Sequence, residues 1–132
     1  YSVVEKIFSF KERNLFLFLY NSITTLSKLL DIKTPLIISS ELNIDHSLKS
    51  TEKVISICKA LKSNIYINPI GGKILYNNSF FKNNNIDLFF LKTKEDRKLQ
   101  KDDHLFLSII DLIMFNDLEV VKEYLNQFSL IH

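Results

Sequence analysis

The sequence contains very little glycine, proline, cysteine and methionine, and it has no tryptophan. In 132 residues there are 2 Gly, 2 Pro, 1 Cys and 1 Met. A single cysteine excludes an internal disulfide and any metal site built from several cysteines, and it favours a reducing compartment. The three histidines are scattered without the spacing of metal ligands, so no metal site is predicted. We expect a cytoplasmic protein, and the residues leave the question of a cofactor open.

The sequence also lacks a large net charge and long apolar runs. The 17 basic and 15 acidic side chains leave a formal charge of +2, which is too small to predict nucleic-acid binding without a clustered basic patch. The apolar run from Leu15 to Tyr20 is far shorter than the roughly 20 residues of a membrane-spanning helix. The first residues are charged and lack the cleavage site of a signal peptide. We therefore expect neither a nucleic-acid partner nor membrane insertion.

Apolar and aromatic residues are plentiful. Hydrophobic residues make up 46% of the chain, with 11 Phe and 5 Tyr, which is enough for the core of one domain over residues 1–132. Because the chain begins at Tyr1 and not at Met, we expect it to be a fragment of a longer protein.

Short apolar runs alternate with helical patterns along the middle of the chain. The pattern predicts strands at Leu36–Ile38, Ile65–Ile67 and Asp87–Leu91, separated by helices over residues 51–62 and 77–83. Further helices are predicted over residues 2–9, 14–30, 105–115 and 118–128; a strand at Leu15–Tyr20 is the alternative to the second of these. This order predicts a small three-layer α/β domain with a short, mostly parallel three-stranded sheet and flanking helices.

In a parallel sheet, ligands bind beyond the carboxyl ends of the strands. Here those ends are Ser39-Ser40-Glu41, Asn68 to Gly72, and Lys92-Thr93. We expect these three segments to share one rim, which we call the predicted rim. The charged segment from Lys92 to Asp103 is predicted to be a solvated loop that can act as a lid.

Both glycines, Gly71 and Gly72, follow the predicted strand at Ile65–Ile67. Two interpretations stay open for them: backbone N–H groups that approach an anion, or a tight turn. Two interpretations also stay open for Ser39, Ser40 and Glu41, which can hold a substrate hydroxyl or amine, or simply cap a turn.

Two further polar pairs stand at predicted helix starts. Thr51 and Glu52 begin a helix capped by Ser50, so they can contact a ligand or serve only the electrostatics of the helix start. Ser108 and Asp111 lie three residues apart in an apolar segment, where they can face a pocket or form a capping box.

Asp45-His46 is a carboxylate beside a histidine, which allows general-base chemistry, although a solvated loop pair is the simpler interpretation. Cys58 lies on the inner face of the helix over residues 51–62, together with Val54, Ile57 and Leu61, and it is expected to be inert core.

A series of these features occurs in a recognisable order. It runs through Ser39-Ser40-Glu41-Leu42, Thr51-Glu52, Ile57 to Leu61, Tyr66, Gly72, Tyr76, Phe80 or Phe81, Ile86, and Leu107 to Asp111. This order resembles the WbqC-like family over about residues 21–116, corresponding to the carboxyl-terminal half of a family member. The resemblance implies substrate-binding residues at the matching positions, which are Ser39, Ser40, Thr51, Glu52, Tyr66, Gly72, Tyr76, Ser108 and Asp111.

The family is found with genes for O-antigen and other surface polysaccharides. The resemblance therefore implies a bacterial acyl or aminoacyl transferase that places glycine or a similar group on an amino sugar, with a nucleotide-sugar or an activated acyl donor as ligand. The alternative is a non-catalytic binding or assembly module, such as a truncated gene product that supports a partner chain or an amino-terminal half. No catalytic residue is assigned. The substrate-binding set is completed by Glu41 and Gly71 from the predicted rim.

Overall fold

The structure is a computed structural model that describes residues 2–93 and 108–132. The proposed lid beyond Thr93 and the start of the apolar segment at Leu105 lie outside the described residues. The chain divides into two compact units, each formed by two separate stretches of sequence. We call them the helical unit and the sheet unit and describe each by itself.

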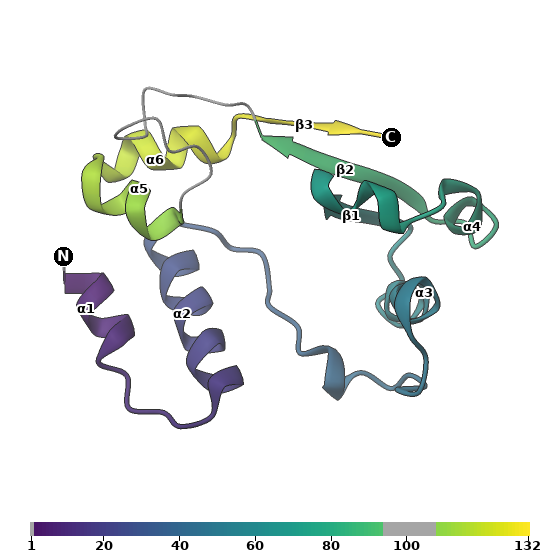
Figure 1. Cartoon of the computed structure of the whole chain (residues 1–132), viewed down its shortest axis with the longest axis horizontal. Helices are drawn as coiled ribbons and strands as arrows, with labels where there is room; N and C mark the ends of the chain where they lie inside the picture. Colours follow the sequence, from purple (N-terminus) through teal and green to yellow (C-terminus); the bar gives the residue numbers. More distant parts are fainter. Residues whose placement is uncertain (1, 94–107) are drawn as a thin grey trace. The chain divides into compact units, whose positions relative to one another are not determined.

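The helical unit contains α1 (Ser2–Phe8), α2 (Leu15–Leu29), α5 (Ile109–Phe115) and α6 (Leu118–Leu125) (Figure 1). Helix α2 begins where it does because the side chain of Asn14 accepts a hydrogen bond from the Leu17 N–H at 3.3 Å. Leu30, Leu112 and Val121 form the buried centre of the unit. Beside this centre, Lys122 on α6 forms an ion pair with Asp31.

The structure confirms a helix over most of residues 14–30, so the alternative strand at Leu15–Tyr20 is wrong. The apolar stripe of this helix is nevertheless largely exposed: Leu15, Leu19 and Ile23 have 69%, 49% and 51% of their surface accessible. Only its last member, Leu30, is buried. Like every other helix in the described part of the chain, α2 does not combine the length and apolar character needed to cross a membrane.

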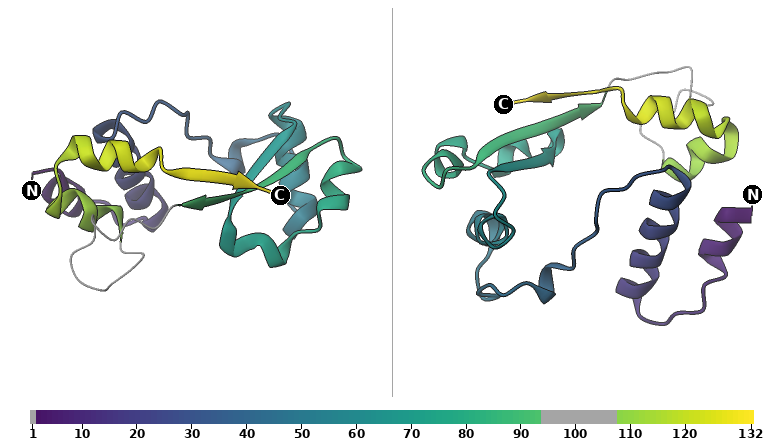
Figure 2. Two further views of the ribbon diagram at one scale, coloured as in Figure 1. Left: turned by 90° about the horizontal axis from the view of Figure 1, so that it is seen from above. Right: turned by 180° about the vertical axis from the view of Figure 1, so that it is seen from behind.

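The sheet unit is built around three strands. It contains the 3₁₀ turns η1 (Ser39–Glu41) and η2 (Ile70–Leu75), the helices α3 (Ser50–Ala60) and α4 (Asn78–Lys82), and the strands β1 (Ile65–Pro69), β2 (Asp87–Thr93) and β3 (Phe128–Ile131). The strand order is β1-β2-β3, with β1 parallel and β3 antiparallel to the central β2. Helix α3 lies on one side of these strands in both Figure 1 and Figure 2.

The core of the sheet unit lies on that same side. Leu88 and Phe90 alternate along β2 and are 1% and 3% exposed, as expected when every second side chain of a strand faces the core. They form one cluster with Ile55, Cys58, Phe81 and Ile86. The predicted inner position of Cys58 is confirmed, whereas Leu61 is 41% exposed and Ile55 takes its place in the core.

The small α/β domain is confirmed, but one of its strands was predicted in the wrong place. Leu36–Ile38 is not a strand, and Leu36 and Ile37 are 42% and 54% exposed. The third strand is β3, where the sequence pattern predicted the end of a helix. Helix α6 ends at Leu125, and Phe128–Ile131 pairs with β2 in the register Leu91↔Leu130. As a strand, Phe128–Ile131 forms its backbone hydrogen bonds with β2, whereas a continued helix would form them within itself.

The start of α3 also differs from the prediction. Ser50 was expected to cap the helix, but Lys49 is the capping residue and no side chain bonds to the first turn. Ser50 is the first residue of the helix and has a positive φ of 47°, a conformation that a side chain such as serine adopts at a cost. Helix α4 begins close to its predicted start, because Asn77 caps it by accepting a hydrogen bond from the Ser79 N–H at 3.0 Å.

Candidate functional site

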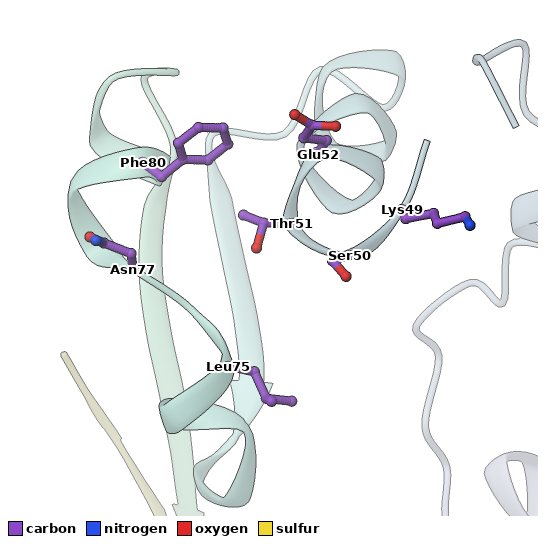
Figure 3. Close-up of a pocket in the computed structure, with 7 residues that line it drawn as sticks. All are labelled: Lys49, Ser50, Thr51, Glu52, Leu75, Asn77 and Phe80. Atoms are coloured by element: carbon purple, nitrogen blue, oxygen red, sulfur yellow. The ribbon is translucent and has the colours of Figure 1, made fainter. Parts of the chain in front are cut away.

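A cavity of about 430 Å³ lies in the sheet unit, where the first turn of α3 faces the segment from η2 to α4 (Figure 3). We call it the Thr51 cavity. Its lining combines one carboxylate, one ammonium group, two hydroxyls, one amide and two apolar side chains. The residues are Lys49, Ser50, Thr51, Glu52, Leu75, Asn77 and Phe80.

Local sequence places these side chains. Helix α3 starts just after Lys49, so Thr51 and Glu52 stand in its first turn. On the opposite wall, the Asn77 cap starts α4 and thereby positions Phe80, which is 44% exposed. Figure 3 shows Thr51 and Phe80 directed toward one another from α3 and α4. The cavity therefore has a polar wall on α3 and an apolar wall on η2 and α4.

The arrangement suits a small polar ligand with one apolar face. The first backbone N–H groups of a helix have no partner within the helix and favour negative or oxygen-rich groups. Glu52 adds a carboxylate that accepts hydrogen bonds from an amine or hydroxyl, and Phe80 offers an aromatic face. Pockets with an apolar surface and a few convergent polar groups are the usual form of small-molecule sites.

Both glycines lie in the 3₁₀ turn η2, which agrees with the tight-turn interpretation, and Gly72 also has a packing role. Neither glycine has a positive φ. A Cβ atom on Gly72 would lie 2.0 Å from Nδ2 of Asn68 and 3.7 Å from Cε2 of Tyr76, whereas one on Gly71 would meet nothing within 4 Å. The absence of a Cβ on Gly72 therefore leaves room for the Asn68 side chain in its observed position, whereas Gly71 faces open space.

Tyr76 belongs to an aromatic cluster in the core of the sheet unit. The ring of Tyr66 stacks on Phe81 with centroids 5.5 Å apart, and Tyr76 packs edge-on against both rings. The hydroxyl of Tyr66 lies 3.4 Å from that of Tyr76 and 3.5 Å from Oδ1 of Asn68. Burial, together with the hydrogen bond to Tyr76, raises the pKa of Tyr66 well above its usual range. These tyrosines support the unit and do not line the Thr51 cavity.

The predicted rim is only partly present. Because β1 and β2 are parallel and Pro69 pairs with Leu91, the carboxyl ends of these two strands do share one edge of the sheet, and Lys92-Thr93 is the end of β2 itself. Ser39, Ser40 and Glu41 do not follow a strand; they form the exposed turn η1, in which the Glu41 N–H donates to the Ile38 carbonyl at 3.0 Å. Among the predicted substrate-binding residues, the structure brings Thr51 and Glu52 together in the cavity.

Ser108 and Asp111 belong to the helical unit. The Ser108 hydroxyl accepts a hydrogen bond from the Ile110 N–H at 3.2 Å, and Asp111 lies in the first turn of α5. This geometry favours helix capping over a pocket for Ser108.

Asp45 is not positioned to act on His46. Its carboxylate accepts hydrogen bonds from the Ser47 hydroxyl at 2.7 Å and from the Ser47 N–H at 2.9 Å, and these bonds lower the pKa of Asp45. Nε2 of His46 lies 3.1 Å from the Leu42 carbonyl. In the described residues, no group of three or more His, Cys, Asp or Glu side chains is arranged to hold a metal ion.

The sequence prediction missed five cavity residues: Lys49, Ser50, Leu75, Asn77 and Phe80. A usable signal was present at Asn77, because an asparagine before a short apolar segment is a typical helix cap and fixes which residue follows one turn later. Lys49 and Leu75 carried no such signal, since their position depends on how α3 faces η2.

Comparison with known proteins places the chain in a family. A model of the WbqC-like protein family matches residues 1–123. The chain belongs to this family. The match confirms the resemblance seen in the sequence, contains every residue that lines the Thr51 cavity, and ends before β3. No curated protein and no solved structure matches the chain.

Proposed function

We propose that this WbqC-like protein acts in the biosynthesis of O-antigen or other surface polysaccharides, as a transferase that places an acyl or aminoacyl group, such as glycine, on an amino sugar. The observation that carries the proposal is the Thr51 cavity, in which Thr51 and Glu52 of α3 line one wall and the aromatic ring of Phe80 lies on the other (Figure 3). A pyranose ring has an apolar C–H face and polar edges, which fits this division. The cytoplasm, where activated donors are made, is the proposed location.

In this proposal the amino sugar lies in the Thr51 cavity with its ring against Phe80. Glu52 accepts a hydrogen bond from the sugar amine, and Thr51 contacts a sugar hydroxyl. The amine nitrogen attacks the carbonyl carbon of the activated donor, a C–N bond forms, and the bond to the leaving group breaks with its electron pair. Glu52 is the proposed acceptor of the proton that the nitrogen loses.

Calorimetric titration with a nucleotide-linked amino sugar tests the acceptor site. Removing the charge in Glu52→Gln is expected to weaken binding by about 10-fold or more, because a hydrogen bond to a charged group contributes about 1.5–3 kcal/mol. Glu123→Gln on α6, which lies in the helical unit, is the matched control and should bind like the unmodified protein. Equal affinity of the two variants, or no binding at all, contradicts the proposal.

Three of the remaining predicted residues have a separate place in the proposal. Ser39, Ser40 and Glu41 on η1 are proposed to contact the acyl donor and not the sugar. A Ser39→Ala/Ser40→Ala double variant should then raise the donor concentration needed for half-maximal transfer and leave amino-sugar binding unchanged. Unchanged donor dependence would remove η1 from the site.

A non-catalytic assembly module is the second candidate function, and one observation favours it. The face of the sheet opposite the core carries Ile65, Ile67 and Leu130, which are 47%, 46% and 41% exposed. Parallel strands are commonly covered on both faces. If a partner chain binds this face, Ile67→Lys should abolish that binding. Co-sedimentation of the protein with its candidate partner measures this loss.

A further inference from the structure

A second cavity of about 290 Å³ adjoins the Thr51 cavity in the sheet unit. It is lined by Leu48, Glu52, Ile55, Ser56, Lys59, Phe80 and Asn84. Glu52 and Phe80 line both cavities. These two side chains therefore border both spaces, so a ligand that contacts both of them lies next to each cavity. We call the second space the Lys59 cavity.

Helical spacing explains why the Lys59 cavity runs along α3. Glu52, Ser56 and Lys59 follow one another at intervals of four and three residues, which places them on one side of the helix. Across from them, Phe80 and Asn84 are also four residues apart. The step of seven positions from Glu52 to Lys59 corresponds to roughly 10 Å along the helix axis. The Glu52 carboxylate and the Lys59 ammonium group can therefore contact different parts of one ligand.

The ammonium group of Lys59 is held in a defined position. Its Nζ donates a hydrogen bond to Oδ1 of Asn84 at 2.7 Å, and Nδ2 of Asn84 donates to the Phe80 carbonyl at 2.9 Å. A lysine ammonium has three N–H donors, so this bond orients the group and leaves two donors for a ligand. Among the residues that the structure describes, no carboxylate forms an ion pair with Lys59.

We propose that the Lys59 cavity binds the phosphate oxygens of the same ligand whose amine lies at Glu52. The inference rests on the proposed function and specifies the acceptor as an amino sugar that carries a phosphate or diphosphate. Lys59 supplies the positive charge, the Ser56 hydroxyl adds a donor, and Phe80 lies between the two polar ends. A neutral sugar would offer no charged acceptor to the two remaining N–H donors of Lys59, whereas a phosphate would form charge-assisted hydrogen bonds with them.

Inorganic pyrophosphate is the probe that tests the Lys59 cavity alone. Calorimetry should show pyrophosphate binding that weakens about 10-fold in Lys59→Gln and becomes weaker as salt is added, since the contact is between charges near the surface. Lys82→Gln, which changes a lysine of α4 outside both cavities, is the control and should bind normally. Equal binding by both variants, or no binding by the unmodified protein, overturns the proposal. Thermal unfolding of each variant checks that the fold is intact.

A second comparison separates this proposal from the proposed function. Glu52→Gln should lose the amino sugar without weakening pyrophosphate binding, because Glu52 lines both cavities and a neutral amide repels an anion less than a carboxylate does. Loss of the amino sugar alone is therefore distinguishable from loss of the phosphate site. Glucosamine 1-phosphate should bind about 10-fold more tightly than glucosamine in the unmodified protein and with nearly equal affinity in Lys59→Gln. If Lys59→Gln instead weakens only acetyl phosphate, the cavity serves the acyl donor and the assignment to the acceptor is wrong.

Discussion

The two adjacent glycines should respond in opposite ways to alanine. In Gly72→Ala the new Cβ would lie 2.0 Å from Nδ2 of Asn68, so the asparagine side chain must rotate. Rotation gives up its contact with the Tyr66 hydroxyl, which at 3.5 Å is a long hydrogen bond and contributes about 0.5 kcal/mol. An off-rotamer asparagine costs up to about 1.5 kcal/mol. Alanine restores about 0.5 kcal/mol by restricting the unfolded chain.

The expected net loss for Gly72→Ala is therefore about 1.5 kcal/mol, which corresponds to a Tm lower by roughly 5 °C. Gly71→Ala meets nothing within 4 Å and requires no positive φ, so it should stabilise the protein by about 0.5 kcal/mol. Urea unfolding followed by circular dichroism measures both free energies of unfolding.

The reasoning has a direct internal test. If Asn68 is the obstacle, Gly72→Ala should cease to destabilise when it is introduced into an Asn68→Ala background, because the close contact no longer exists. Equal stabilities of Gly71→Ala and Gly72→Ala would refute the packing role of Gly72. So would an unchanged penalty in the Asn68→Ala background.

Three further results are expected from the remaining titratable groups. The hydrogen bond and charge of Lys122 lower the pKa of Asp31. The pair therefore stabilises the fold above pH about 4, and this contribution is lost as the pH falls through the lowered pKa of Asp31. In Lys122→Gln, the pKa of Asp31 measured by NMR should be higher. The pKa of Tyr66 is raised, so stability should decline as the pH rises above about 10, and Tyr66→Phe should not show this loss. Burial raises the pKa of Cys58, so a thiol reagent should modify this residue only after the protein is unfolded in urea. Rapid modification of the folded protein would contradict the place of Cys58 in the core.

Local patterns were enough to predict most elements of the fold. The asparagines at positions 14 and 77 mark the starts of α2 and α4, and the apolar runs after residues 64 and 86 become β1 and β2. These features depend on neighbours in the sequence. Leu36–Ile38 and Phe128–Ile131 are both short apolar runs, yet only the second is a strand, because only it pairs with β2. A choice that depends on a distant partner is not visible in a short pattern.

The candidate site likewise combines residues that a local pattern predicted with residues whose position depends on a distant segment. Thr51 and Glu52 were predicted from the start of a helix, and they do line a cavity. The other wall comes from η2 and α4, about 25 residues later, and its contribution depends on how the two segments face each other. Ser39, Ser40 and Glu41 were linked to the site through a strand at Leu36–Ile38 that does not form, because that strand required a long-range pairing that a local pattern does not show.

The way the two units share the chain has a consequence for synthesis. The helices α1 and α2 belong with α5 and α6, while β1 and β2 receive β3 from beyond α6. A nascent chain that has reached β2 therefore holds an open sheet edge and two helices without their partners. Neither unit can be completed until residues near the end of the sequence have left the ribosome. We expect ribosome-bound intermediates to need protection from aggregation until that moment, because Phe90 pairs with Ile131 only then.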